Sequence, residues 1–308
     1  MKIVENILGG RVVGVVSGRR LPTDGVSRSA DGVPVIDVTD VATEITGKDA
    51  RDIIRPLSGI RLPFHRCMFV AQTSSKCWPD GEFELAMLVA DGIPSSDDKE
   101  NGSLIPHGIG GLLFASGPQD KDTALVGLIS TAIDESGHID STCNCGHCFC
   151  GWKTQYTCEA ENPQSSTDPE MEWRAGVAGE AMKLGVVSAT FAMALMNCKN
   201  VHAREQPCSP KLAKRYQERH GHKRPRYYVL DIEPMRQKFR DANGGKDGIS
   251  LAKALHICRG HFKDYREKPL FGKVSGMFWW QPHVRGTAEA GIVEKDYRIK
   301  LGSEAPHR

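Results

Sequence analysis

The sequence predicts an α+β protein with an antiparallel β-rich N-terminal part, one long central helix and a basic β-rich C-terminal unit. Three observations predict this class: short apolar runs of period two before residue 130, one long apolar stretch, and a change of charge along the chain. Residues 1–198 carry 16 Lys and Arg against 26 Asp and Glu, whereas residues 199–308 carry 24 against 12. We therefore divide the chain into an acidic region with a cysteine cluster, 1–165, and a basic region, 166–308.

The N-terminal region contains six short runs rich in Val, Ile, Leu and Phe, separated by Gly, Pro and Asp. Runs of this length and spacing favour antiparallel strands over a parallel array in which helices alternate with strands. The expected strands are 11–16, 33–38, 67–72, 83–89, 110–115 and 124–129.

The strongest helix prediction covers about residues 168–198. Pro169 suits the first turn of a helix, and Glu170 complements the positive end of the helix dipole. The body of this segment is apolar on more than one side, which is typical of a central helix covered by a sheet. Its uncharged part, 184–196, is shorter than the ~20 residues that a bilayer requires. We therefore expect a buried helix and no membrane contact.

A cysteine cluster precedes this helix and predicts a zinc site. Cys145 and Cys148 have the C-x2-C spacing that chelates zinc through a tight turn. The other ligands would come from the remaining cysteines or from His138 or His147. A structural site is favoured over a catalytic one because thiolates dominate the ligand set. The alternative is a group of free thiols on a loop. The candidate cysteine ligands are Cys143, Cys145, Cys148, Cys150 and Cys158.

A basic connector follows the long helix and leads into a strand expected at 227–232. Its cations suit the phosphate backbone of a nucleic acid, although a charge run of this kind is also typical of a solvated helix face. The candidate phosphate contacts are Lys211, Lys214, Arg215, Lys223 and Arg224.

Two arginine–histidine pairs lie in the C-terminal unit, whose strands are expected at 255–265, 276–280 and 291–299; the second pair follows the strand that ends at Trp280. Arg259 and His261 are two residues apart, as are His283 and Arg285, so on a strand each pair shares one face. Imidazole transfers protons near neutral pH, and guanidinium binds phosphate through two parallel hydrogen bonds. The alternative is that these residues form hydrogen bonds across strands and contribute only stability.

The two pairs together fit metal-independent cleavage of a phosphodiester. His261 and His283 would be base and acid, Arg259 and Arg285 would bind the phosphate, and Tyr265 or Lys263 would be a further donor. Trp280, after Trp279, offers a platform on which a base can stack. This hypothesis requires the segments near residues 260 and 284 to lie side by side and to share one hollow.

The C-terminal part resembles a family of bacteriophage and prophage proteins that has no assigned activity. The resemblance rests on an ordered set of short motifs, and residues 63–69 show a weaker similarity to the same family. It implies a phage or mobile-element origin and no particular chemistry. The motifs are Asn-Cys-Lys-Asn-Val at 197–201, His-Ile-Cys-Arg-Gly-His-Phe-Lys-Asp-Tyr at 256–265, Pro-Leu-Phe-Gly at 269–272, Gly-Met-Phe-Trp-Trp at 276–280, His-Val-Arg-Gly at 283–286 and Lys-Asp-Tyr at 295–297.

These observations predict a protein that is encoded by a phage or mobile element and acts on nucleic acid, with RNA or single-stranded nucleic acid as the favoured partner. The more specific hypothesis is a ribonuclease-like effector or toxin in the cytoplasm of a bacterial host. The alternative is an accessory module that binds nucleic acid or protein without chemistry. The acidic and basic regions also suit association between copies of the chain, which would give a homo-oligomer.

Overall fold

The structure is a computed structural model, and it forms two compact units, Met1–Ile232 and Glu233–Arg308. The predicted boundary followed residue 165 and grouped the long helix with the C-terminal strands. The structure instead groups that helix with the N-terminal sheet, on which it packs. The residues described are 2–14, 24–45, 49–54, 57, 59–74, 81–94, 104–117, 120–133, 137–139, 148–149, 152–156, 169–233, 235, 254–258, 260–280, 283–285 and 287–292.

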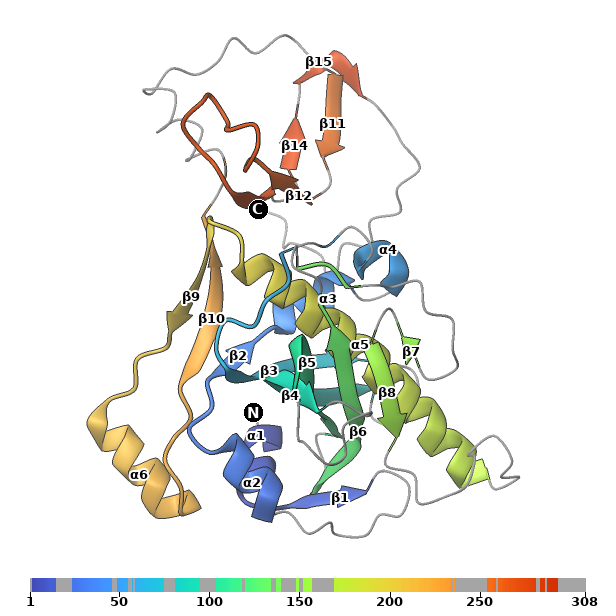
Figure 1. The fold of residues 1–308 in the computed structure, drawn as a ribbon, viewed down its shortest axis with the longest axis vertical. Helices are drawn as coiled ribbons and strands as arrows, with labels where there is room; N and C mark the ends of the chain where they lie inside the picture. Colours follow the sequence, from blue (N-terminus) through green and yellow to red (C-terminus); the bar gives the residue numbers. More distant parts are fainter. Residues whose placement is uncertain are drawn as a thin grey trace, which may run out of the picture. The chain divides into compact units, whose positions relative to one another are not determined.

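The first unit is built on a mixed sheet in which ten described strands join (Figure 1). The strands follow the order β7-β8-β6-β5-β4-β3-β2-β10-β9, and β1 pairs with β6. All six strands predicted in the N-terminal region are present. The bounds are β1 Val12–Gly14, β2 Val35–Asp37, β3 Arg66–Ser74, β4 Glu82–Pro94, β5 Leu104–Ser116, β6 Thr123–Ala132, β7 Cys148–Phe149, β8 Trp152–Tyr156, β9 Val201–Glu205 and β10 Tyr227–Ile232.

The prediction of antiparallel pairing is confirmed for the central strands and for β7 with β8, but not for the whole sheet. Neighbours from β3 to β6 are antiparallel, as are β6 and β8. In contrast, β2 is parallel to both β3 and β10, and β1 is parallel to β6. Parallel neighbours need a crossover connection, and short helices supply part of it here.

Six helices are present in the described part of the first unit, and four of them were not predicted. Helices α1 to α4 have five to seven residues each, which is too short for a helical repeat to stand out among the strands. The predicted long helix is confirmed as α5. The bounds are α1 Lys2–Leu8, α2 Asp24–Ala30, α3 Thr39–Ile45, α4 Ala50–Ile54, α5 Pro169–Met196 and α6 Pro210–His220.

Helices cover both faces of the sheet. Helix α1, with α2 beside it, buries Ile3, Val4 and Ile7 in a cluster with residues of β2 to β6. Helix α5 packs with α3 and α4 against β3 to β6. Gly185 allows this close approach, because a Cβ there would lie 2.6 Å from Leu113 Cδ1. Residues Gly179–Met196 of α5 have the length and hydropathy of a membrane span, but 72% of that stretch is buried, as expected for a core helix.

The second unit has a small core between short strands. Strand β11 pairs with β14 and β15, and β12 pairs with β13. Met235, Tyr265 and Phe278 form the buried cluster, with Leu270 and Val274 packed against it. The prediction of strands at 255–265 and 276–280 is confirmed by β11, β12 and β13. The bounds are β11 Ala254–Cys258, β12 His261–Asp264, β13 Met277–Trp280, β14 His283–Arg285 and β15 Thr287–Ile292.

Candidate nucleic-acid interface

One face of the β12–β13 hairpin carries three of the predicted site residues. His261 pairs with Trp280 in the ladder, and their rings stack in nearly parallel planes with centroids 6.2 Å apart. Lys263 Nζ lies 5.8 Å from the centroid of the Trp280 ring and 5.6 Å from that of Tyr265. A cation over an aromatic face is held by the ring quadrupole. His261 and Lys263 are exposed, so this face presents an imidazole, an ammonium group and part of an indole.

Tyr265, the predicted further donor, is a core residue of the second unit. Its side chain is 7% exposed, and its ring packs against Phe278 with centroids 5.9 Å apart. This burial fits a packing role beneath the hairpin face.

The ladder β11–β14 positions the second predicted pair. His283 lies opposite Cys258, and Arg285 lies opposite His256. In the hairpin, His261 lies opposite Trp280. The step from Cys258 to His261 is three residues, and so is the step from Trp280 to His283. The two ladders therefore follow one register, although they belong to separate sheets.

The same register separates the two histidines along the strands. His283 lies three positions beyond Trp280, the partner of His261, which corresponds to about 10 Å at ordinary strand rise. An odd step also reverses the face in a regular strand. A common phosphate between His261 and His283 therefore requires an irregular strand between the ladders. Arg259 lies outside the described residues.

An ion pair at the end of β12 engages the carboxylate of Asp264. Arg266 Nη2 donates to Asp264 Oδ2 at 2.6 Å, and Arg266 Nε donates to both carboxylate oxygens. These hydrogen bonds hold the pKa of Asp264 below its usual value. Asp264 is thus a negative partner for Arg266.

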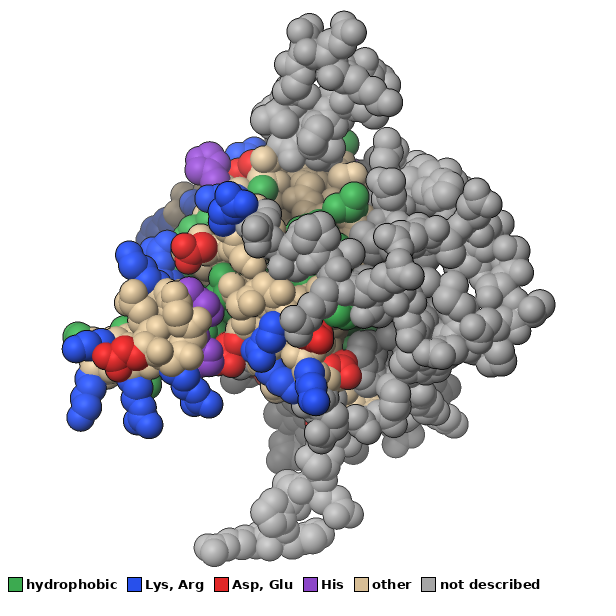
Figure 2. All heavy atoms as spheres, turned by 90° about the horizontal axis from the view of Figure 1, so that it is seen from below, with side chains coloured by type: hydrophobic (Ala, Val, Ile, Leu, Met, Phe, Trp, Pro, Cys, Tyr) green, Lys and Arg blue, Asp and Glu red, His purple; other side chains and the backbone are tan. Residues whose placement is uncertain are grey.

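The basic connector forms helix α6 and the turn that follows it, which is the solvated helix considered from the sequence. Ser209 caps the helix through a hydrogen bond from Leu212 N, and Gly221 ends it with a φ of 76°. None of the residues of α6 is buried. Its exposed cations form what we call the outer face of α6. Figure 2 shows lysine and arginine side chains projecting from the left edge of the view, where Figure 1 places α6. The outer face consists of Lys211, Lys214, Arg215 and Arg219.

The opposite side of α6 anchors it to the sheet unit. Tyr216 and His220 are half-buried and stacked, with centroids 4.4 Å apart, and His220 Nε2 lies 3.9 Å from Glu5 Oε1 in α1. Burial raises the pKa of Tyr216 to about 12. The contact with Glu5 has no signal in the sequence, because it joins residues far apart in the chain.

The other predicted cations lie in the turn after α6. Lys223 is exposed, and Arg224 is half-buried with its guanidinium 5.2 Å from the centroid of the Tyr227 ring. Glu218 is the one acid in α6, and its carboxylate lies 3.9 Å from Nζ of Lys214 on the outer face. The helix and turn therefore retain a large excess of positive charge.

The predicted zinc site stays a prediction. Cys143, Cys145, Cys150 and Cys158 lie outside the described residues, and Cys148 is described only as the start of the backbone of β7. Within the described part of the chain, no three His, Cys, Asp or Glu side chains are placed to hold a metal ion. The alternative ligand His138 has its Nδ1 within 3.1 Å of the Leu57 carbonyl oxygen.

Comparison with known proteins adds no relative. No protein-family model matches this chain, and neither a curated protein nor a solved structure is similar to it.

Proposed function

We propose that this protein binds nucleic acid and that the outer face of α6 contacts the phosphate backbone. The observation that carries the proposal is the row formed by Lys211, Arg215 and Arg219. These residues are four apart, so the three cations stand on one side of the helix at intervals of about 6 Å. A row of exposed cations is the electrostatic complement of a polyphosphate chain.

Part of the charge arrangement of α6 is unfavourable for the isolated helix, although Arg219 in the last turn suits the negative end of the helix dipole. Like charges four residues apart destabilise a helix by about 0.2–0.5 kcal/mol per pair, and α6 has two such pairs in its outer row. The first turn has no acid, although acids are favoured there, and it contains Lys211. Phosphate groups bound along this face would remove the repulsion. The arrangement is therefore better suited to binding a polyanion than to stabilising the fold.

Single-stranded nucleic acid, RNA in particular, is the favoured form of the ligand. The hairpin face with His261, Lys263 and Trp280 combines a cation with stacked rings. Unpaired bases stack on aromatic side chains, and each stacked base contributes about 1–3 kcal/mol. Bases within a duplex are already stacked and do not offer this contact.

The proposal is tested by titrating the protein with fluorescently labelled single-stranded RNA, single-stranded DNA and duplex DNA in the presence of a chelator. We expect binding by fluorescence anisotropy that weakens steeply as salt is raised, with the single strands bound more tightly than the duplex. An absence of binding at low salt would contradict the proposal.

Metal-independent cleavage of RNA is the second candidate function. The common register of the two ladders favours it, because it aligns the chain segment of His261 with the segment of His283. The three-residue step between the ladders weighs against a common site, so we place binding before cleavage. Incubation of labelled RNA with the protein in chelator tests it. Cleavage that is lost in both His261→Ala and His283→Ala, with folding retained, would support it.

The resemblance of the C-terminal motifs to phage and prophage proteins supports a mobile-element origin. We therefore propose the cytoplasm of a bacterial host as the place of action, in a toxin, defence or phage-takeover role. Association of the acidic surface of one copy with the basic face of another would compete with nucleic acid. Size measurement at low and high salt distinguishes this case, because such an oligomer dissociates as salt is raised.

A further inference from the structure

The first unit has a hollow of about 190 Å³ at the ends of three neighbouring strands, away from the residues proposed above. Strands β3, β2 and β10 lie side by side and run parallel, and all three begin at this point. Backbone hydrogen bonds hold the three ends together: Val35 N donates to Arg226 O at 2.8 Å, and Met68 N donates to Pro34 O at 2.9 Å. The backbone around the hollow is thus held by hydrogen bonds between neighbouring strands.

Two arginines make the hollow attractive to an anion. Arg66 and Arg226 both line it and both are exposed, and neither forms an ion pair with any residue that the structure describes. His65 Nδ1 lies 3.2 Å from Asp91 Oδ2, so the nearby carboxylate of Asp91 already has a partner. Asp31 is the one acid in the lining, so the lining carries two positive charges from arginine and one negative charge. Guanidinium groups bind phosphate through paired, charge-assisted hydrogen bonds.

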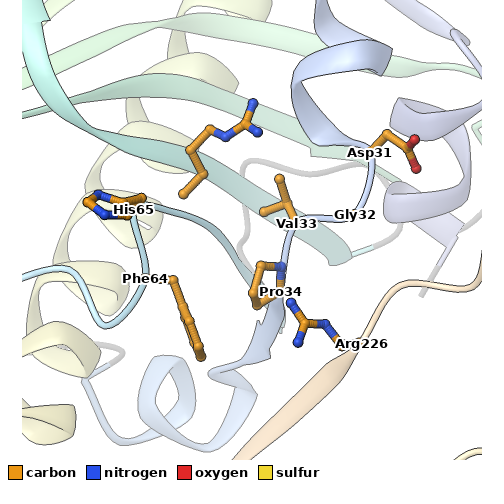
Figure 3. Close-up of a pocket in the computed structure, with 8 residues that line it drawn as sticks. Asp31, Gly32, Val33, Pro34, Phe64, His65 and Arg226 are labelled. Carbon is orange, nitrogen blue, oxygen red and sulfur yellow. The ribbon is translucent and has the colours of Figure 1, made fainter.

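The remaining wall is apolar and contains an aromatic ring. Phe64, half-buried, is supported by Tyr228, whose ring centroid lies 5.3 Å from its own. Figure 3 shows Phe64 and Arg226 on two sides of Pro34, with the Asp31 carboxylate apart from both, beyond Gly32. The lining therefore combines a ring held in place with a cation across a short apolar surface.

We propose that this hollow binds a single nucleotide, with its phosphate on Arg226 and Arg66 and its base against Phe64. Ligand pockets for whole drug-sized molecules have about 300–1,000 Å³, so a hollow of this volume holds one ring and one phosphate and leaves the rest of the ligand in solvent. A dinucleotide is too large for it. The nucleotide is either free or the end of a strand, and both present the same chemistry. The site does not depend on the outer face of α6.

The test is isothermal titration calorimetry of the full chain with a nucleoside 5′-monophosphate, the matching nucleoside and inorganic phosphate. We expect the nucleotide to bind about tenfold or more tightly than either part alone. Arg226→Gln and Arg66→Gln should each weaken nucleotide binding by about tenfold or more, because each removes hydrogen bonds to a charged group. Phe64→Leu should lower the affinity for the nucleotide to nearly the affinity for inorganic phosphate. Arg51→Gln removes an exposed arginine outside the lining of the hollow; it is the matched control and should leave nucleotide binding unchanged.

Oligonucleotides with and without a 5′-terminal phosphate distinguish the two sources of the nucleotide. If the protein prefers the phosphorylated strand and this preference disappears in Arg226→Gln, the hollow binds the end of a strand. If the protein shows no such preference but binds the mononucleotide strongly, the hollow binds a free nucleotide. Three results would overturn the proposal: no saturable nucleotide binding at millimolar concentration, binding that survives both arginine substitutions, or equal affinity for nucleotide and inorganic phosphate. Because both arginines are exposed, their variants should keep the unfolding temperature of the parent chain.

Discussion

Neutralising the outer row of α6 should abolish most of the salt-dependent binding of nucleic acid. The perturbation is the triple substitution of Lys211, Arg215 and Arg219 by Gln. Each phosphate contact contributes a slope of about −0.7 to a plot of log affinity against log salt for single strands. Removal of three contacts should therefore make the slope shallower by about 2. Between 50 and 200 mM salt, the parent chain should lose about 20-fold more affinity than the variant.

The same variant should fold at least as well as the parent chain. The three side chains are exposed, and α6 buries none of its residues. The substitution removes two repulsive pairs four residues apart, so the free energy of unfolding should stay constant or rise by up to about 1 kcal/mol. Loss of binding together with unchanged or increased stability separates a binding role from a structural one.

The assay is fluorescence anisotropy with a labelled single-stranded RNA over a series of salt concentrations, together with urea unfolding of each variant. A matched control replaces three exposed cations elsewhere in the first unit, Arg51, Lys121 and Lys183, by Gln. It makes the same change of net charge without touching α6. Equal slopes for the parent chain and the α6 variant, or an equal loss in the control, would refute the assignment of the phosphate contacts to α6.

Four further predictions concern the fold and its ionisation. Gly179→Ala should stabilise the protein by up to about 1 kcal/mol, since a Cβ there meets nothing within 4 Å. Gly185→Ala should give a smaller gain or a loss, because its Cβ would lie 2.6 Å from Leu113 Cδ1 and this side chain would have to shift; urea unfolding measures both. Thr190→Val should cost about 1–3 kcal/mol, because the buried Trp152 Nε1 loses the acceptor that it contacts at 3.0 Å, and near-ultraviolet circular dichroism should report the change at the indole. Ser209→Ala should lower the helix content of α6 and cost about 1 kcal/mol, measured by circular dichroism and unfolding. Arg266→Gln should raise the pKa of Asp264 toward its usual value in an NMR titration. In the parent chain the ion pair contributes to stability above about pH 4, and this contribution is lost as the pH falls through the lowered pKa of Asp264.

Local patterns in the sequence predicted the elements whose signal lies within one segment. The apolar run at 67–72 became β3, and the segment that begins at Pro169 became α5, because alternation and helix-start signals act over neighbouring residues. Helices α1 to α4 were missed because five to seven residues contain too few turns for a periodic pattern. The parallel pairing of β2 with β10 joins segments that are far apart in the chain, and no local pattern specifies such a partner.

The candidate sites show the same limit. The composition of the connector predicted the cations of α6, but not the contact between His220 and Glu5 that fixes which side of the helix faces solvent. The spacing within each arginine–histidine pair is visible in the sequence. The register that separates His261 from His283 follows from cross-strand pairing, which only the structure supplies. The hollow beside Phe64 lies where three strands begin, and these strands are far apart in the chain, so no local sequence pattern predicts it.

Photo-crosslinking of the full chain to thiouridine-labelled single-stranded RNA, followed by mass spectrometry of the crosslinked peptides, locates the contact without any substitution. Because the label is on the base, we predict crosslinks at the hairpin face of His261, Lys263 and Trp280 and within residues 211–224, which hold the outer face of α6, and their loss as salt is raised. Crosslinks that fall in neither segment, or none at a salt concentration where the RNA is bound, would contradict the proposed interface.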